Sequence, residues 1–291
     1  MSLAKNSKYF FLTAVLSAIL IPDVASRLEF LVVPLLIVVM TVSLKDVGFR
    51  HISKRDVEEV ASLTLLNYVF LGAIYMLVAT LFESPYKEAL MLLGIMPPAA
   101  GIISLSKIYH GDMKISFLTE FTGYFVAMLV IPIATPFLFD ASLGIWSILE
   151  TVFYIMILPF VLSRFLHNWD LKHPQRTDHT RLVINTCYSF AFFVIIGLNI
   201  DAVFDIRTHW DIYVALFLLK FGIGTLLYLI FKNKVASKDS VLIVLFGTFK
   251  NGGAALAFAL LLFGPQATIP YAIGGITTPL FMIYLEWLLK K

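Results

Sequence analysis

The sequence is poor in charged residues and has a single cysteine. Of its 291 residues only 14% are charged and 59% are hydrophobic, whereas soluble domains have about 25% charged residues. So few charges cannot cover a water-facing surface, so we predict an all-α protein embedded in a membrane. A lone Cys187 excludes an intrachain disulfide. The six histidines fall in connections or at helix ends, so we predict no metal site and no cofactor.

Long apolar runs fill the chain, and a membrane-spanning helix needs about 20 such residues. Ten runs are interpreted as spans: 8–22, 28–44, 57–82, 86–109, 113–139, 143–166, 182–200, 211–231, 240–263 and 267–289. The first run follows two lysines, as a signal peptide does, but the repeated pattern behind it favours a membrane helix. Only the stretch 167–181 is long and polar enough to be a linker.

Two of these ten runs are interrupted at matching places. The pair Pro97-Pro98 breaks the fourth run, and Asn251-Gly252-Gly253 breaks the ninth. Backbone freed from a helix cannot face lipid, and paired breaks of this kind mark the binding site of many transporters. We therefore predict two inverted five-helix repeats, 1–140 and 141–291. The broken fourth and ninth helices should cross near the bilayer midplane.

The Lys and Arg residues are distributed unequally between the two predicted sides. One side, with both termini, holds 17 of them and the other holds 3, while Lys220 and Lys250 lie inside the membrane. Positive charge collects on the cytoplasmic side of membrane proteins. We predict a multi-pass protein of a prokaryotic-type cytoplasmic (inner) membrane, with both termini in the cytoplasm.

Four ionisable residues fall at membrane depth, where each costs about 2.5–3.5 kcal/mol on insertion scales. Lys250 precedes the second break, and it either serves function or caps its own half helix. Glu120 is a candidate salt-bridge partner of Lys250 or Lys220, proton carrier or cation ligand, or part of a structural ion pair. Lys220 would pair with Glu120 or meet an anionic substrate. For Glu150, near a helix end, a place at the interface is favoured.

Polar and backbone groups around the two breaks complete the candidate site. Half-helix N-termini present free N–H groups suited to an anion. With the charged residues Lys250, Glu120 and Lys220, the candidate substrate or coupling residues are Asn251, Ser116, Thr248, Gly252, Gly253, Pro97 and Pro98.

Three stretches carry a resemblance to a known family. Residues 33–50, 97–108 with Gly111, Asp112 and Ser116, and 246–257 are similar to the bile acid:sodium symporter family. Pro97 to Ala100 with Tyr109 also resembles the related auxin efflux carriers. The resemblance implies a panel of helices 1, 2, 6 and 7 and a core of helices 3–5 and 8–10. Substrate would lie in the crevice between them.

The residues that hold sodium in that family are mostly different here. The family's Ser-Asn pair is Ile102-Ile103, its Glu is Phe246, its Gln is Lys250 and its Thr is Glu120, while Ser116 and Asn251 match. The resemblance therefore implies that the sodium sites are lost. A fixed ammonium at Lys250, balanced by Glu120, would stand in for a sodium ion.

The favoured function is secondary transport of a small organic anion by alternating access, either coupled to H⁺ or facilitative. The alternatives are a sodium-coupled symporter, an efflux carrier and, from another class, a membrane ligand sensor or receptor, which would normally carry an output domain. An enzyme is disfavoured, because no nucleophile with a base and no metal cluster occurs at a common depth. The expected partners are the anion and the lipid bilayer, not nucleic acid.

Overall fold

The structure is a computed structural model that describes residues 7–45, 52–99, 101–139, 144–172 and 180–289. These residues are almost entirely helical, and no strand occurs among them. Five helices are long and apolar enough to cross a membrane: Lys54–Ala79, Met113–Leu138, Ile145–Trp169, Ile206–Phe231 and Pro265–Leu289. The prediction of an all-α, membrane-embedded protein is thus confirmed in outline, while the count of ten spans stays a prediction.

The elements follow one another along the chain with few residues between them. They are α1 (Ser7–Leu20), α2 (Pro22–Ser26), η2 (Glu29–Leu31), α3 (Val32–Leu44), α4 (Lys54–Leu65), η3 (Leu66–Leu71), α5 (Gly72–Ala79), α6 (Tyr86–Ile95), α7 (Ile102–Ile108), α8 (Met113–Leu138), α9 (Ile145–Val152), η4 (Phe153–Ile157), α10 (Leu158–Lys172), α11 (Thr180–Leu198), α12 (Ile200–Phe204), α13 (Ile206–Phe217), η5 (Leu218–Gly222), α14 (Ile223–Phe231), α15 (Ser237–Phe246), α16 (Gly252–Phe263), η6 (Pro265–Thr268) and α17 (Ile269–Leu289).

Shorter helices occupy the remaining predicted runs. Three of them are apolar and unbroken, Phe10–Leu20, Glu29–Leu44 and Leu182–Leu198. The predicted linker at 167–181 is wrong in its first part, because α10 continues to Lys172. No proline lies between Pro159, at the start of α10, and Pro174, so its polar end stays helical. Residues 173–179 of this linker lie outside the described residues, as do residues 46–50 of the first family-like stretch.

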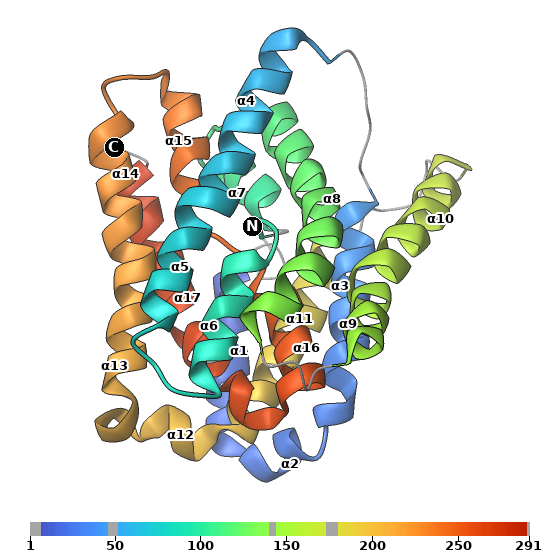
Figure 1. Ribbon diagram of the computed structural model, residues 1–291, viewed down its shortest axis with the longest axis vertical. Coiled ribbons are helices and arrows are strands. Elements are labelled where there is room, and N and C mark those ends of the chain that lie inside the picture. Colours follow the sequence, from blue (N-terminus) through green and yellow to red (C-terminus); the bar gives the residue numbers. More distant parts are fainter. Residues whose placement is uncertain (1–6, 46–51, 100, 140–143, 173–179, 290–291) are drawn as a thin grey trace.

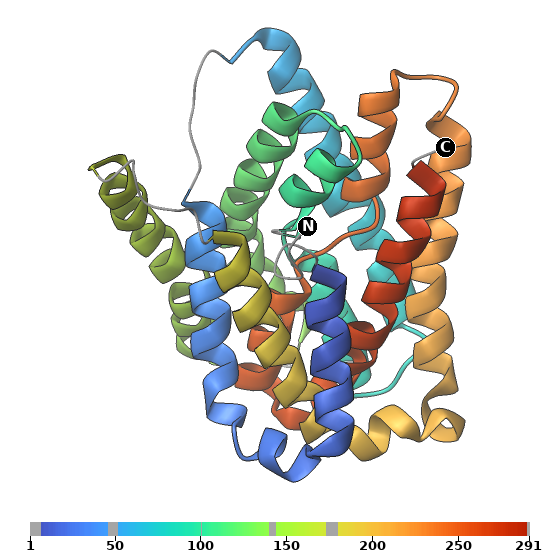
Figure 2. The same ribbon diagram turned by 180° about the vertical axis from the view of Figure 1, so that it is seen from behind.

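The helices pack in two groups. Helix α11 packs against α1, α2 and α3, and α10 packs against α3; Figure 2 shows α1, α3 and α11 side by side. In the other group α6 packs against α5 and α16, α8 against α4 and α7, and α14 against α15. In Figure 1 the helices α7 and α15 lie in the upper half, and α6 and α16 in the lower half.

Three long helices contain a π-helical segment, namely η3, η4 and η5. A π turn inserts one extra residue, which rotates the following side chains to a different face, and such turns are frequent at functional sites. Segment η3 carries Asn67 and Tyr68, and η5 carries Lys220. All three of these side chains make polar contacts with other helices, described below.

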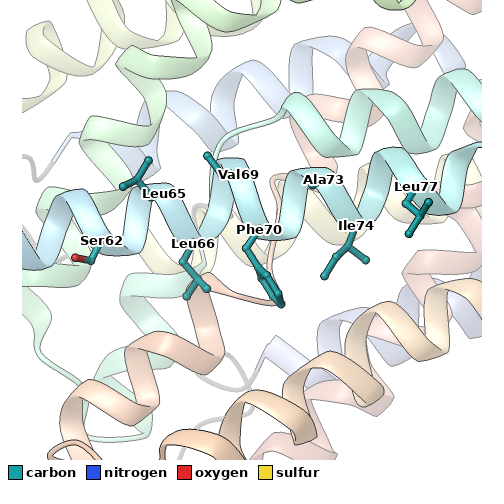
Figure 3. A pocket seen from close by; sticks show the side chains of 8 residues that line it. All are labelled: Ser62, Leu65, Leu66, Val69, Phe70, Ala73, Ile74 and Leu77. Atoms are coloured by element: carbon teal, nitrogen blue, oxygen red, sulfur yellow. The ribbon is translucent and has the colours of Figure 1, made fainter.

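An apolar groove of about 690 Å³ runs along the outer face of α4, η3 and α5 (Figure 3). Ser62 is the only polar residue that lines it, and Leu65, Val69 and Leu77 are each more than half exposed. A face of this kind suits contact with lipid tails. The polar groups described next come from other residues of these helices, so the groove is not the candidate site.

Candidate functional site: the crossing of two broken helices

The first broken helix stops at the double proline. Helix α6 ends at Ile95, and the next residue, Met96, is extended, with φ −70° and ψ 155°. A residue before proline is driven out of the helical region, and proline itself has no N–H to continue a helix. The helix resumes as α7 only at Ile102. This leaves a short extended segment between the two half helices.

The second broken helix is interrupted in the same way, and the two interruptions meet. Helix α15 ends at Phe246 and α16 begins at Gly252. The Asn251 backbone N–H donates to the Pro97 carbonyl at 2.8 Å, and Pro98 and Lys250 form an antiparallel bridge. Backbone groups freed by the breaks therefore satisfy each other across the crossing. The predicted interruptions and their meeting are both present in the structure.

Glycines let neighbouring elements approach the crossing closely. A Cβ added to Gly123 of α8 would lie 2.5 Å from Cδ of Pro98. A Cβ on Gly253 would lie 3.1 Å from the Tyr188 ring and 3.2 Å from Leu36. Any side chain at Gly123 would push the Pro98 segment away, so this glycine is required by contact.

The carboxyl end of α6 is capped by a buried lysine from the other broken helix. Lys250 Nζ donates to the carbonyls of Gly94 at 2.9 Å and Met96 at 3.0 Å. It also lies 4.7 Å from the centroid of the Tyr68 ring, and the residue is only 6% exposed. A cation is stabilised at the negative end of a helix and over an aromatic face. The sequence left two interpretations of Lys250 open, a functional role or a cap of its own half helix, and in the structure it caps the other broken helix instead.

The carboxyl end of α15 is capped by a neutral amide instead. Asn67 Nδ2 donates to the carbonyls of Phe246 at 2.7 Å and Phe249 at 3.1 Å, and the residue is fully buried. Sequence reasoning missed Asn67. A signal was present, since an asparagine amid the apolar run 57–82 needs buried partners.

The amino end of α16 has a side-chain cap. Asn251 Oδ1 accepts from the Ala254 N–H at 2.9 Å, and its Nδ2 donates to the Tyr124 hydroxyl at 2.6 Å. This is the usual role of asparagine at a helix start. One residue thus joins the crossing, the half helix and α8.

The amino end of α7 has no side-chain cap. The residue before it is Gly101, and a Cβ added to this glycine would enter open space. The Ile103 N–H, in the first turn of α7, approaches the Glu120 carboxyl group of α8 but does not form a full hydrogen bond with it. Three of the four half-helix ends at the crossing are therefore capped by side chains, and the fourth faces a carboxyl group.

Glu120 is buried without a partner. It is 2% exposed, and neither carboxyl oxygen has a hydrogen-bond partner. Among the described residues it forms no ion pair with Lys250 or Lys220, whose contacts are all with neutral groups. The predicted balance of Lys250 by Glu120 is thus not made in this arrangement. Lys250 instead donates to two carbonyl oxygens.

Three predicted site residues make no polar contact across the crossing. Lys220 binds the hydroxyls of Thr278 and Thr277 and the Gly274 carbonyl, and so ties η5 to α17. Thr248 lies in the second break, but its hydroxyl donates to the Val244 carbonyl of the preceding helix α15.

Ser116 lies between α8 and α7, where its hydroxyl donates to Ser106 at 2.7 Å and approaches the Asp112 carbonyl. Glu150 is exposed on α9, in agreement with the favoured reading of an interfacial residue.

Tyrosines from three helices surround the crossing, and sequence reasoning missed them. Tyr124 follows Glu120 by one turn on α8, and its hydroxyl interacts electrostatically with Glu120, Tyr68 and Tyr188. The Tyr68 hydroxyl donates to the Gly123 carbonyl at 2.6 Å. The i,i+4 spacing of Glu120 and Tyr124 was a readable signal, because residues so spaced share a helix face.

A polar rim closes one end of the site. Asp112 caps the start of α8 by accepting from the Lys114 and Ile115 N–H groups, and Lys238 contacts it at 3.1 Å. Partial burial alone raises the pKa of Asp112, but these hydrogen bonds and the Lys238 ammonium outweigh it, so the pKa lies below its ordinary value. The rim therefore links α8 to the start of α15 through an ionised carboxylate.

No family model and no curated protein matches this chain. No group of three or more His, Cys, Asp or Glu side chains suited to a metal ion occurs within the described ranges. The resemblance to the symporter family therefore depends on the residues of the chain itself. Geometry has to support any functional proposal.

Proposed function

We propose that this protein is a secondary transporter that moves a small organic anion across a membrane by alternating access. The observation that carries the proposal is the antiparallel pairing of two broken helices, through Asn251 N–H and the Pro97 carbonyl. Irregular backbone at membrane depth is tolerated only in protein or beside a water-filled cavity. In transporters, crossings of this kind lie at the substrate and coupling-ion site.

Ten spans in two inverted repeats are part of the proposal. Five long helices support it directly, and three shorter apolar helices and two broken pairs overlap the other predicted runs. In Figure 1 the two broken pairs run in opposite directions, as inverted repeats require. The excess of Lys and Arg on one side supports cytoplasmic termini.

Movement between a panel and a core would open the crossing. The packing of α11 on α1 and α3, and of α10 on α3, supports a panel. The crossing, α4, α8 and α14 would form the core. The panel touches the crossing through Tyr188 and Leu36 beside Gly253, so sliding of these groups would uncover the start of α16.

The charges at the crossing support an anionic substrate and argue against sodium. Among the described residues Lys250 Nζ contacts carbonyl oxygens and the Tyr68 ring, and no carboxylate lies within ion-pair distance of it. In its charged form Lys250 would therefore present a positive field that is not neutralised, and such a field in a low-dielectric crevice concentrates anions. Because the amine already occupies the carbonyl end of α6, no free sodium ion is needed there.

The proposal is tested first by ligand binding. Purified protein is screened against small organic acids by thermal shift, with sodium or choline as the cation and at several pH values. A ligand that binds the folded state raises the unfolding temperature. Stabilisation by an acid that is equal in sodium and choline supports the proposal, and stabilisation that requires sodium supports the sodium-coupled alternative.

Uptake then separates a transporter from a sensor. The acid identified in the screen is radiolabelled and offered to proteoliposomes. Saturable accumulation that is unaffected by replacing sodium with choline is expected. Binding without uptake in either direction would favour a ligand sensor. Uptake that rises steeply with sodium would contradict the sodium-independent proposal. Import and export are distinguished only by the gradients in the cell.

A further inference from the structure

Glu120 is a buried acid whose surroundings provide no counter-charge. Its side chain is 2% exposed on α8, both oxygens lack a hydrogen-bond partner, and the Ile103 N–H approaches it without a full hydrogen bond. An isolated carboxylate in such a place is very costly, and proteins respond by keeping the group neutral.

The charged groups on the elements around α8 are committed elsewhere or lie apart from Glu120. On α4, Lys54 and Arg55 pair with Glu58 and Glu59, and Asp56 pairs with Lys114. Lys250 is held by two carbonyls. The remaining charged residues of these elements are Lys87 and Glu88 on α6, Lys107 on α7 and Glu150 on α9, and no ion pair joins any of them to Glu120. The titratable hydroxyls nearby are those of Tyr124, Tyr68 and Tyr188.

A bound metal cation is a poorer explanation than a proton. Hard cations require several oxygen ligands. Ile103, whose N–H approaches Glu120, and its neighbour Ile102 have apolar side chains. The Ser116 hydroxyl is engaged with Ser106. One carboxyl group with few further oxygens is suited to binding a proton.

We infer that Glu120 is a proton-binding site: it holds a proton while the crossing is closed, and releases that proton when the crossing opens to water. This inference rests on the proposed function and names both its coupling ion and the residue that carries it. The carboxyl group can donate or accept toward Tyr124, one turn further along α8.

Glu120 lies beside both broken helices, so its ionisation would act on both. The Ile103 N–H of α7 approaches it, and Tyr124, which accepts from the Asn251 amide at the start of α16, lies one turn further along α8. A carboxylate at this place would attract the N–H dipoles around it. Release of the proton would thus draw the two breaks toward α8, and this attraction would couple proton exchange to movement of the crossing.

Infrared spectroscopy of the purified protein without ligand tests the inference directly. The carbonyl stretch of a protonated carboxylic acid is recorded near neutral pH, for wild type, Glu120→Gln and the matched control Glu150→Gln. Glu150 is an exposed acid on α9, so its replacement leaves the buried carboxyl group in place. We expect the band in wild type and in Glu150→Gln, and its loss in Glu120→Gln. A band that is absent from wild type, or that persists in Glu120→Gln, would overturn the inference.

The pH dependence of thermal unfolding gives a second readout. An acid held neutral in the folded state lowers stability as pH rises above the ordinary value for glutamic acid, about 4.3. The unfolding temperature of wild type should therefore fall, relative to that of Glu120→Gln, as the pH rises above this ordinary value. Parallel curves for the two proteins would contradict the inference.

Sodium and substrate controls keep the inference separate from the proposed function. If the band disappears when potassium is replaced by sodium, the carboxylate is a cation ligand and the inference fails. Neither experiment requires a transported substrate. Transport without the band would therefore reject only the proton site, whereas the band without transport would reject only the transporter.

Discussion

The two broken helices have similar backbones but different chemistry at their ends. Helix α6 is capped at its carboxyl end by the charged Lys250, and α15 by the neutral Asn67. At the amino ends, α16 is capped by Asn251, while α7 has no side-chain cap and faces Glu120. The first broken helix, α6 with α7, thus lies against both buried ionisable groups, whereas the second, α15 with α16, is capped by amides. The comparison teaches that a nearly symmetric crossing can have all its ionisable groups at one of the two helices.

The largest effect is expected at the carboxyl ends. Lys250→Met removes two charge-assisted hydrogen bonds and leaves the Gly94 and Met96 carbonyls, at the end of α6, without a donor. This should lower the unfolding free energy by about 2–3 kcal/mol. Asn67→Leu removes two neutral bonds from α15 and should cost about 1–2 kcal/mol. Equilibrium unfolding in mixed micelles measures both. Equal losses, or a larger loss for Asn67→Leu, would remove the distinction between a charged and a neutral cap.

The amino ends should differ by a smaller amount. Asn251→Ala removes the cap of α16 and the bond to Tyr124, at a cost of about 1–2 kcal/mol. Gly101→Ala removes no cap and enters open space with helical φ and ψ, so it should change stability by less than about 0.5 kcal/mol. The same unfolding assay compares them. A strongly destabilised Gly101→Ala would show that the start of α7 is as tightly held as that of α16.

A double-mutant cycle sharpens the relation between the two buried charges. Since Lys250 and Glu120 make no ion pair, Lys250→Met and Glu120→Gln should be additive in unfolding free energy within about 0.5 kcal/mol. The sequence analysis predicted that Glu120 balances Lys250, and residues paired in that way would cost more when neutralised singly than together. A coupling energy well above this limit would restore that expectation and contradict the arrangement seen here.

A small effect is also expected at the rim, where Asp112 contacts Lys238. The pKa of Asp112 lies below its ordinary value, so its carboxylate stabilises the fold above about pH 4 and loses this contribution as pH falls through its folded-state pKa. Asp112→Asn keeps a helix cap and removes only the charge facing Lys238, at a cost below about 1 kcal/mol. Acid titration of thermal stability should be flatter for the variant, and an unchanged acid slope would show that the ion pair contributes nothing.

Sequence reasoning predicted the breaks because proline and glycine act through local backbone geometry. Pro97 and Pro98 stop a helix wherever they occur, and Gly252 and Gly253 weaken one. The helix ends were therefore placed to within a few residues, apart from the false linker at α10. Apolar residues in long runs were enough to indicate membrane helices.

The partners of the buried charges were beyond sequence reasoning, because they depend on contacts across the fold. Lys250 binds carbonyls more than 150 residues away in the chain, and Asn67 does the same in the other direction. Backbone carbonyls have no sequence signature, so charge pairing between Lys250 and Glu120 was the simpler expectation. Lys220 was assigned to the site because the sequence shows that it lies deep in a membrane span. The sequence does not show that its partners are on α17.

Alternating access at the crossing is tested most directly by the reactivity of one cysteine. Gly101→Cys, placed in open space at the start of α7, is made in a Cys187→Ala background and reconstituted into liposomes. A membrane-impermeant thiol reagent is then added to one side or the other. We predict that the cysteine reacts from both sides, and that a ligand from the acid screen shifts reactivity from one side to the other. Reaction from a single side under every condition would contradict transport by this chain.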